Sequence, residues 1–214
     1  MRNSSTNHPA ILEVLSTEGE IENVIGKPSS KVFAKVLHSL DDICRAFIAR
    51  SPFVVVASSD SAGNVDVSPK GDPAGFVYVL DDCTIAIPER PGNRRADTFR
   101  NVLQNPQVGL MFVVPDKGET LRISGRARIV RDDWLRERMK VADRLPELVL
   151  LVTVEEAFLH CTKCMVRSQM WKPETWNSEG LASIGEAMVV HGNLDLSIAE
   201  MRAIAENDEQ TRLY

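Results

Sequence analysis

The sequence predicts a mainly β protein with flanking helices, an α+β fold built on an antiparallel barrel. After residue 50, short segments rich in β-branched residues recur, and turn residues such as Gly, Asn and Asp separate them. Only two helical stretches interrupt this series. The connections are mostly short, whereas parallel neighbours need crossovers of a dozen or more residues, so we expect antiparallel neighbours. Six or seven strands connected in this way favour a barrel over a parallel sheet.

The first two expected strands form a hairpin. Phe53–Ala57 is a β-branched run, Ser59–Asn64 has turn chemistry, and Val65–Ser68 alternates apolar and polar residues. A later strand, Leu121–Val130, alternates in the same way except at Gly125, which predicts a bulge or bend. The remaining strand candidates are Phe76–Leu80, Thr84–Ile87, Val108–Val114 and Leu148–Val154.

Helical segments are expected before and after the barrel in the sequence. Residues 1–50 form the predicted helical lead-in, with a helix between Val32 and Leu40 and another at Leu40–Ala49. Residues 51–180 form the expected barrel domain, and residues 181–214 form a helical tail. The two helices inside the barrel domain are expected at Arg94–Gln104 and Asp133–Arg144.

Composition limits the classes of function. The chain has 214 residues, of which 43% are apolar, and its formal net charge is -5, which argues against a general nucleic-acid binder. Residues 1–10 lack the apolar run of a secretory signal, and no uncharged apolar stretch approaches the ~20 residues of a membrane helix. The expected location is the cytoplasm. The four cysteines do not suggest a disulfide framework, because a chain of this length and apolar content does not need one.

The most informative segment for chemistry is Ile87–Arg95, with the sequence Ile-Pro-Glu-Arg-Pro-Gly-Asn-Arg-Arg. If Asn93 caps a helix, Arg94 and Arg95 occupy its first two positions, where the helix dipole disfavours cations. A bound phosphate would reverse that effect, since it would meet free backbone N–H groups and two guanidinium groups. The alternative is a solvated arginine pair on a surface helix.

Asp66–Asp72 is a second candidate segment. A strand that ends in Ser68-Pro69-Lys70 can present a hydroxyl, backbone groups and one ammonium to a ligand. Pro69 also indicates a strand edge or end, because proline cannot donate to a ladder. A simple strand exit is the alternative interpretation.

The segments His160–Cys164 and Arg167–Pro173 are weaker candidates. Cys161 and Cys164 form a Cys-x-x-Cys pair, but no second ligand pair is near enough in sequence to complete a zinc site, so no metal is assigned. His160 and Lys163 remain possible polar groups near a ligand. Trp171 can stack on a flat ring system or pin the tail against the barrel. Dinucleotide-binding, P-loop, α/β-hydrolase and zincin motifs are missing.

Five segments in one order resemble a bacterial branch of the pyridoxamine 5'-phosphate oxidase-like, FMN-binding split-barrel superfamily. The resemblance covers about residues 40 to 190. The segments are Asp66–Asp72, Ile87–Arg95, Asn105–Leu110, Phe158–Lys163 and Arg167–Trp171.

The resemblance implies a six-stranded antiparallel split barrel and a homodimer, with FMN at the interface between the subunits. The family's basic pair at the flavin phosphate falls on Arg94 and Arg95, with Asn93 beside it. The residues expected along the rest of the cofactor are Val67, Ser68, Pro69 and Lys70 on one strand, Ile87 and Pro88 at the end of another, and Trp171 from the partner subunit.

The predicted function is that of an FMN-dependent oxidoreductase acting on a small molecule, with NADH or NADPH as a possible electron donor. Lys70 is a candidate for stabilising charge on the reduced ring, and no general base is assigned. The Arg-x-His that handles substrate in true pyridoxamine 5'-phosphate oxidases is missing, which leaves the substrate open. A non-catalytic flavin carrier and a haem-binding barrel, with His160 as the tempting ligand, are the alternatives.

Overall fold

The computed structural model describes residues 13–214, and these divide into two compact units, of which the first ends at Lys35 and the second covers residues 36–214. The stretch 1–10, used above to argue against a signal, lies outside the described residues. In the first unit, α1 (Glu18–Ile25) starts with a capping box in which Thr17 and Glu20 satisfy each other's backbone N–H groups. A second, short helix, α2 (Ser30–Phe33), follows.

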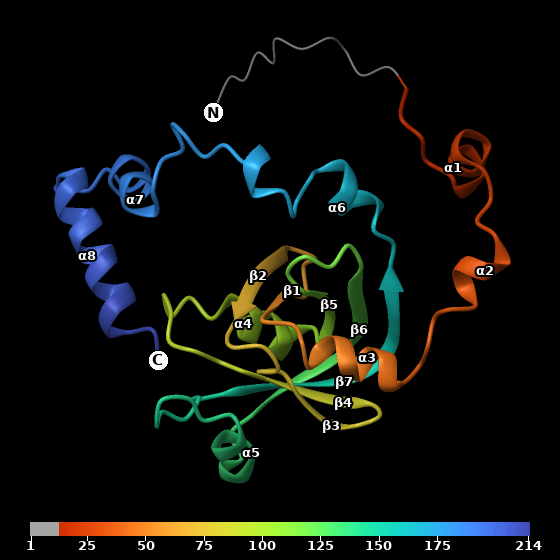
Figure 1. The fold of residues 1–214 in the computed structure, drawn as a ribbon, viewed down its shortest axis with the longest axis horizontal. Helices are drawn as coiled ribbons and strands as arrows, with labels where there is room; N and C mark the ends of the chain where they lie inside the picture. The colour runs from red at the N-terminus through yellow and green to blue at the C-terminus, as the bar shows by residue number, and fades with distance from the viewer. Residues whose placement is uncertain (1–12) are drawn as a thin grey trace. The chain divides into compact units, whose positions relative to one another are not determined.

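The second unit is an antiparallel sheet with helices around it (Figure 1). Its strands are β1 (Phe53–Ser59), β2 (Val65–Gly71), β3 (Tyr78–Asp81), β4 (Thr84–Pro88), β5 (Gln107–Val113), β6 (Thr120–Val130) and β7 (Val149–His160). Its helices are α3 (Asp42–Ile48), α4 (Asp97–Gln104), α5 (Asp133–Arg138), α6 (Lys163–Arg167), the 3-10 turn η1 (Pro173–Thr175), α7 (Ile184–Gly192) and α8 (Ile198–Thr211).

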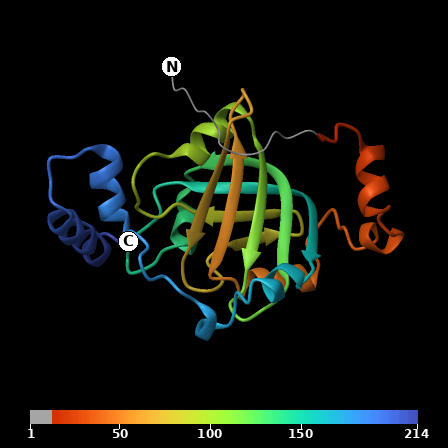
Figure 2. The ribbon, with the colours of Figure 1, turned by 90° about the horizontal axis from the view of Figure 1, so that it is seen from above.

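The sheet has seven strands in the order β2-β1-β5-β6-β7-β4-β3, and it is not closed. The expectation of six strands is therefore corrected, because the short strand β3 adds an outer edge beside β4. The sheet bends so that its β2–β1–β5 end and its β4–β3 end form two layers (Figure 2). Strands from both layers contribute side chains to one core cluster, among them Val56 of β1, Phe112 of β5 and Ile85 of β4.

The long strands β6 and β7 connect the two layers. Their register shifts between Ser124 and Gly125, which confirms the predicted irregularity at Gly125. A Cβ atom at residue 125 would lie 2.1 Å from the backbone oxygen of Thr153, so only glycine fits there. The close approach of β6 and β7 at this point thus depends on a single residue.

Two helices close the core against solvent. The side chain of Asp41 accepts a hydrogen bond from the Cys44 backbone N–H at 2.8 Å and caps α3, and this bond lowers the pKa of Asp41. Burial raises the pKa of the Cys44 thiol to about 11, so this cysteine is an inert core residue. On another surface of the sheet, Leu135 and Met139 from α5 and the residue that follows it pack against Ala86, Val149 and Leu151.

Several predicted helices are shorter in the structure. The helix expected over residues 32–40 ends at Phe33, because the chain then extends and Leu37 pairs with Ala157 of β7. The helix expected at Asp133–Arg144 ends at Arg138. The chain leaves the helix at Met139 and then turns back between Val141 and Arg144, where Ala142 and Asp143 adopt positive φ angles of 47° and 60°. Within residues 13–214, no helix is long and apolar enough to cross a membrane.

Candidate functional site

A pocket of about 1270 Å³ lies where the end of β2 meets the segment after β4. Its volume exceeds the ~300–1,000 Å³ typical of small-molecule sites. Most of its lining comes from four parts of the chain: residues 66–71 of β2, residues 88–99 from the end of β4 into α4, the loop 143–148, and the tail residues Arg212 and Tyr214. Phe76 and Arg136 complete the lining. The two segments singled out from the sequence, Asp66–Asp72 and Ile87–Arg95, are therefore brought together by the fold.

Two ion pairs connect β2 and the residue after it to the segment after β4, although these strands are not neighbours in the sheet. Lys70 Nζ lies 3.1 Å from Glu89 Oε2, and Arg90 Nε lies 2.6 Å from Asp72 Oδ2. The Asp72 side chain is only 1% exposed, and Arg90 also donates to the backbone oxygen of Met139 at 2.8 Å. Arg90 is thus a largely buried residue, paired with Asp72 and bonded to Met139, that holds the wall of the pocket in place.

The arginine pair does not occupy the first turn of a helix, which corrects the predicted start at Arg94. Helix α4 begins at Asp97, because Arg94 and Ala96 have left-handed backbones with φ angles of 60° and 56°. Asn93 does not cap the helix; its Oδ1 accepts from the backbone N–H of Arg95 at 3.0 Å. The start at Asp97 also agrees with the dipole, since the first turn then carries an acidic residue instead of two cations.

Arg94 and Arg95 differ in how their charge is compensated. Arg95 Nε lies 2.7 Å from Asp97 Oδ2, and this contact raises the pKa of Arg95. Within the described residues, the guanidinium of Arg94 has no ion-pair or hydrogen-bond partner, although it lines the pocket. No side chain caps the N-terminus of α4 either, because Ala96 stands at the N-cap. An unpaired cation and an uncapped helix end therefore lie together at the pocket.

The loops around the pocket hold unusual backbone conformations. Seven described non-glycine residues have positive φ, and four of them lie in two pocket-lining loops: Arg94 and Ala96 in one, Ala142 and Asp143 in the other. A left-handed conformation costs an alanine roughly 1–2 kcal/mol. Strain of this kind tends to collect at functional sites, where the surrounding structure maintains it.

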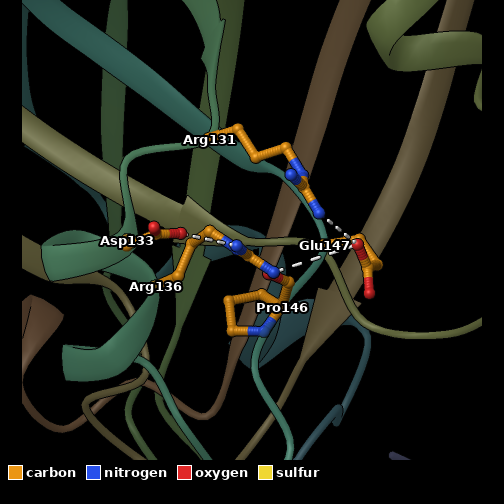
Figure 3. A network of polar contacts seen from close by, with 5 residues as sticks. All are labelled: Arg131, Asp133, Arg136, Pro146 and Glu147. Atoms are coloured by element: carbon orange, nitrogen blue, oxygen red, sulfur yellow. Dashed lines mark hydrogen bonds and ion pairs between the residues drawn. The ribbon is translucent and has the colours of Figure 1, made fainter.

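A polar network holds the loop that contains Ala142 and Asp143 (Figure 3). The Arg136 side chain is 8% exposed, and its Nε donates to the Pro146 carbonyl oxygen at 2.7 Å. Its other guanidinium nitrogens face Asp133 at 2.9 Å and Glu147 at 3.9 Å, and Arg131 contacts Glu147 at 3.2 Å. The network fastens residues 146–147 to α5, so this wall of the pocket is pre-formed.

The structure places most of the predicted cofactor residues at the pocket and two elsewhere. Those that line it are Val67, Ser68, Pro69, Lys70, Pro88, Asn93, Arg94 and Arg95. Ile87 is buried in the core with 1% exposure, and the Nε1 of Trp171 donates to the Lys117 backbone oxygen at 2.8 Å, away from the pocket. The contact of Trp171 with a ligand bound by a partner subunit stays a prediction.

The Cys-x-x-Cys segment does not contribute to the pocket. Cys161 and Cys164 are exposed free thiols, and His160 ends β7 opposite Thr120. Across residues 13–214, no group of three or more His, Cys, Asp and Glu side chains is placed to hold a metal ion.

Sequence reasoning missed the contribution of the tail. The Tyr214 hydroxyl donates to Asp72 Oδ1 at 2.8 Å, and its ring lies 5.8 Å from the Arg90 guanidinium carbon. Arg144 donates to the backbone oxygen of Tyr214. Tyr214 and Asp72 are separated by 142 positions, and no local sequence pattern signals a contact over that distance.

The fold and the pocket together define an antiparallel β protein with a large pocket that several arginines line. The family model described as pyridoxamine 5'-phosphate oxidase matches residues 40–161, which is more than half of the chain. The chain belongs to this family. No curated protein matches the sequence.

Solved structures of similar proteins come from several bacteria. HupZ from Group A Streptococcus is 22% identical with a TM-score of 0.46, and the match covers 56% of this chain and 93% of HupZ. An FMN-binding protein from Syntrophomonas wolfei is 12% identical with a TM-score of 0.42, and the match covers 66% and 97% of the two chains. The heme storage protein HutZ from Vibrio cholerae is 18% identical with a TM-score of 0.40, and the match covers 57% and 94%.

Proposed function

We propose that this protein binds FMN in the large pocket and is a flavin-dependent oxidoreductase acting on a small molecule. The family assignment supports a flavin, and the pocket supports a ligand that carries a phosphate. The observation on which the proposal depends most is Arg94, whose unpaired guanidinium lines the pocket beside the uncapped N-terminus of α4.

The phosphate would lie at residues 93–97. A dianion there would meet the Arg94 guanidinium, the Arg95 guanidinium and the free backbone N–H groups of the first turn of α4. Arg95 is already paired with Asp97, but its side chain is 73% exposed and can reorient without losing a buried contact. Phosphate binding would also offset the strain of the left-handed backbone at Arg94 and Ala96.

The flat ring would lie along β2, at Val67–Lys70, with Pro88 at the opposite wall. Strand β2 is an edge of the sheet, so alternate backbone N–H and C=O groups on its free side have no strand partner. Such groups can hydrogen-bond to the polar edge of a flavin ring, except at Pro69, which has no N–H. The ammonium of Lys70 is paired with Glu89, so any role at the ring requires Lys70 to share its charge with that carboxylate.

When bound, FMN would supply the hydride-accepting chemistry of the reaction. The chain itself would bind the phosphate through Arg94 and Arg95, orient the ring along β2, and keep the wall rigid through the Arg90–Asp72 pair. NADH or NADPH is a candidate electron donor. The missing Arg-x-His argues against pyridoxal phosphate synthesis.

A homodimer is part of the same proposal. The outward face of β2, β1 and β5 carries a continuous apolar patch, formed by residues that are paired across these strands. Two residues of the patch, Val67 and Pro69, also line the pocket. The patch consists of Val65, Val67, Pro69, Phe53, Val55, Ala57, Met111 and Val113. An exposed apolar surface of this kind marks an interaction site, and a second copy seated on it would come close to the pocket.

A haem protein and a flavin carrier are the competing functions. None of the described histidines, His38, His160 and His191, lines the pocket, so the residues present favour a flavin phosphate over a histidine-ligated haem. The absorption spectrum of the purified protein separates these ligands, since a flavin absorbs near 450 nm and haem gives a Soret band. Turnover of NADH or NADPH with added FMN then separates an enzyme from a carrier.

The double variant Arg94→Ala with Arg95→Ala tests the phosphate site. Charge-assisted hydrogen bonds contribute about 1.5–3 kcal/mol each, so the FMN dissociation constant should rise at least about a hundredfold. Riboflavin, which lacks the phosphate, should bind both proteins with similar affinity. Isothermal titration or quenching of flavin fluorescence measures both constants.

The matched control is Arg50→Ala with Arg100→Ala, which removes two exposed arginines that do not line the pocket. This variant should bind FMN as the wild type does. Equal FMN affinity in the Arg94, Arg95 variant and the wild type would refute the phosphate assignment.

A further inference from the structure

The tail of the second unit reaches the pocket through only a few residues. Helices α7 and α8 pack on each other, and within α8 only Met201 is buried. Ile198 and Ile204 of α8 remain 38% and 53% exposed. Arg212 and Tyr214, just after α8, line the pocket.

Polar contacts fasten the end of this segment to the pocket wall. The Tyr214 hydroxyl donates to Asp72 Oδ1 at 2.8 Å, and the Tyr214 backbone oxygen accepts from Arg144. The phenol ring lies over the guanidinium of Arg90 at 5.8 Å, within the range of a cation–π contact. Asp72 and Arg90 belong to the buried ion pair, so the tail is attached to a rigid part of the wall.

The attachment is specific but weakly supported by apolar burial. The Tyr214 phenol is protonated at neutral pH and can donate, and its hydrogen bond to Asp72 raises its pKa further. Among residues 198–214, only Met201 is buried, so little apolar burial would hold the tail if the hydroxyl bond broke. Segments held by few buried contacts are those that open locally at low free-energy cost.

We propose that residues 198–214 act as a latch on the pocket, with Tyr214 as the positioning residue that holds the latch closed and limits the exchange of a phosphate-bearing ligand. The latch opens when the Tyr214 hydroxyl leaves Asp72, and it closes over bound ligand with Arg212 and Tyr214 as a wall. This inference rests on the proposed function for the identity of the ligand, FMN, but not for the contacts of the tail.

The variant Tyr214→Phe tests the latch, because it keeps the ring over Arg90 and removes only the hydroxyl bond. Loss of a hydrogen bond to a charged group should speed FMN dissociation by about tenfold. Stopped-flow recovery of flavin fluorescence on dilution measures this rate. The control is Tyr78→Phe, which removes the hydroxyl that accepts from Arg138 at 2.8 Å outside the large pocket, and it should leave the rate unchanged.

A second measurement needs no flavin. Trypsin cleavage after Arg212, followed by intact mass, reports how often the tail leaves the wall, and Tyr214→Phe should raise its rate by about tenfold where cleavage tracks the open population. An unchanged cleavage rate in Tyr214→Phe, or an unchanged FMN dissociation rate, overturns the latch. If the wild type binds no FMN, the proposed function fails, and the cleavage rates still decide whether the latch exists.

Discussion

The arginines at the pocket differ in whether their side chains bind other groups of the protein or can bind a ligand. Arg90 is paired with Asp72, donates to the Met139 carbonyl oxygen, and lies under the Tyr214 ring. Its positive charge is therefore compensated by groups of the protein itself. Arg94 has no such partner among the described residues. Two arginines four positions apart therefore have opposite roles, and only the contacts of their side chains distinguish them.

Replacement of Asp72 by alanine tests the structural role of the buried pair. The change leaves the largely buried Arg90 guanidinium without its counter-charge, and removal of one partner of a buried pair typically costs about 3–5 kcal/mol. We expect the free energy of unfolding, measured with urea at neutral pH, to fall by that amount. The double variant Asp72→Ala with Arg90→Met removes both charges and should recover part of the loss. An equal loss in the single and double variants would contradict the argument.

At the scale of elements, the strands follow from the sequence more closely than the helices do. The β-branched runs predicted β1, and the alternation of Leu121–Val130 predicted β6 to within one residue. Helix ends depend on the backbone of individual loop residues. Helix α4 starts three residues later than predicted, because Arg94 and Ala96 take left-handed conformations that no residue-type signal announces.

Among positions that control how the strands pair, Gly125 has the clearest expected effect on stability. A Cβ atom there would meet the Thr153 backbone oxygen at 2.1 Å, so Gly125→Ala must push β6 and β7 apart. We expect a loss of about 1–3 kcal/mol or more in thermal or urea unfolding. Gly109→Ala on β5 is the matched control, since its Cβ would meet the Ala57 Cβ at an ordinary 3.9 Å and should have little effect. A comparable loss in both variants would show that strand flexibility, rather than the clash, sets the cost.

At the scale of the whole molecule, the predicted homodimer has a physical basis in the outward apolar patch of β2, β1 and β5. Val55 of β1 lies in the middle of the patch, between Pro69 of β2 and Met111 of β5, and is partly exposed. The patch would bury apolar area on association and place a second subunit beside the pocket.

Val55→Glu should disrupt that association. A carboxylate at the centre of an apolar interface loses its hydration without gaining a partner, so sedimentation velocity should show a shift from dimer to monomer. FMN affinity should fall with it if the partner subunit completes the site. Ile43→Glu on α3, at another exposed apolar position outside the patch, serves as the control. A wild type that is monomeric at micromolar concentration, or a Val55→Glu variant that is still dimeric, would rule out this interface.

The sequence by itself determined the α+β class, the strands, the bulge at Gly125 and the two segments that meet at the pocket. These features are local, because alternation, β-branched runs and turn residues act over a few positions. Only the tertiary structure decided that the sheet stays open with seven strands, that Arg94 is unpaired while Arg95 is not, and that Tyr214 closes onto Asp72. The reason is physical: which charge finds a partner depends on residues far apart in the chain, and the strained backbone at Arg94 and Ala96 is maintained by the packing around it.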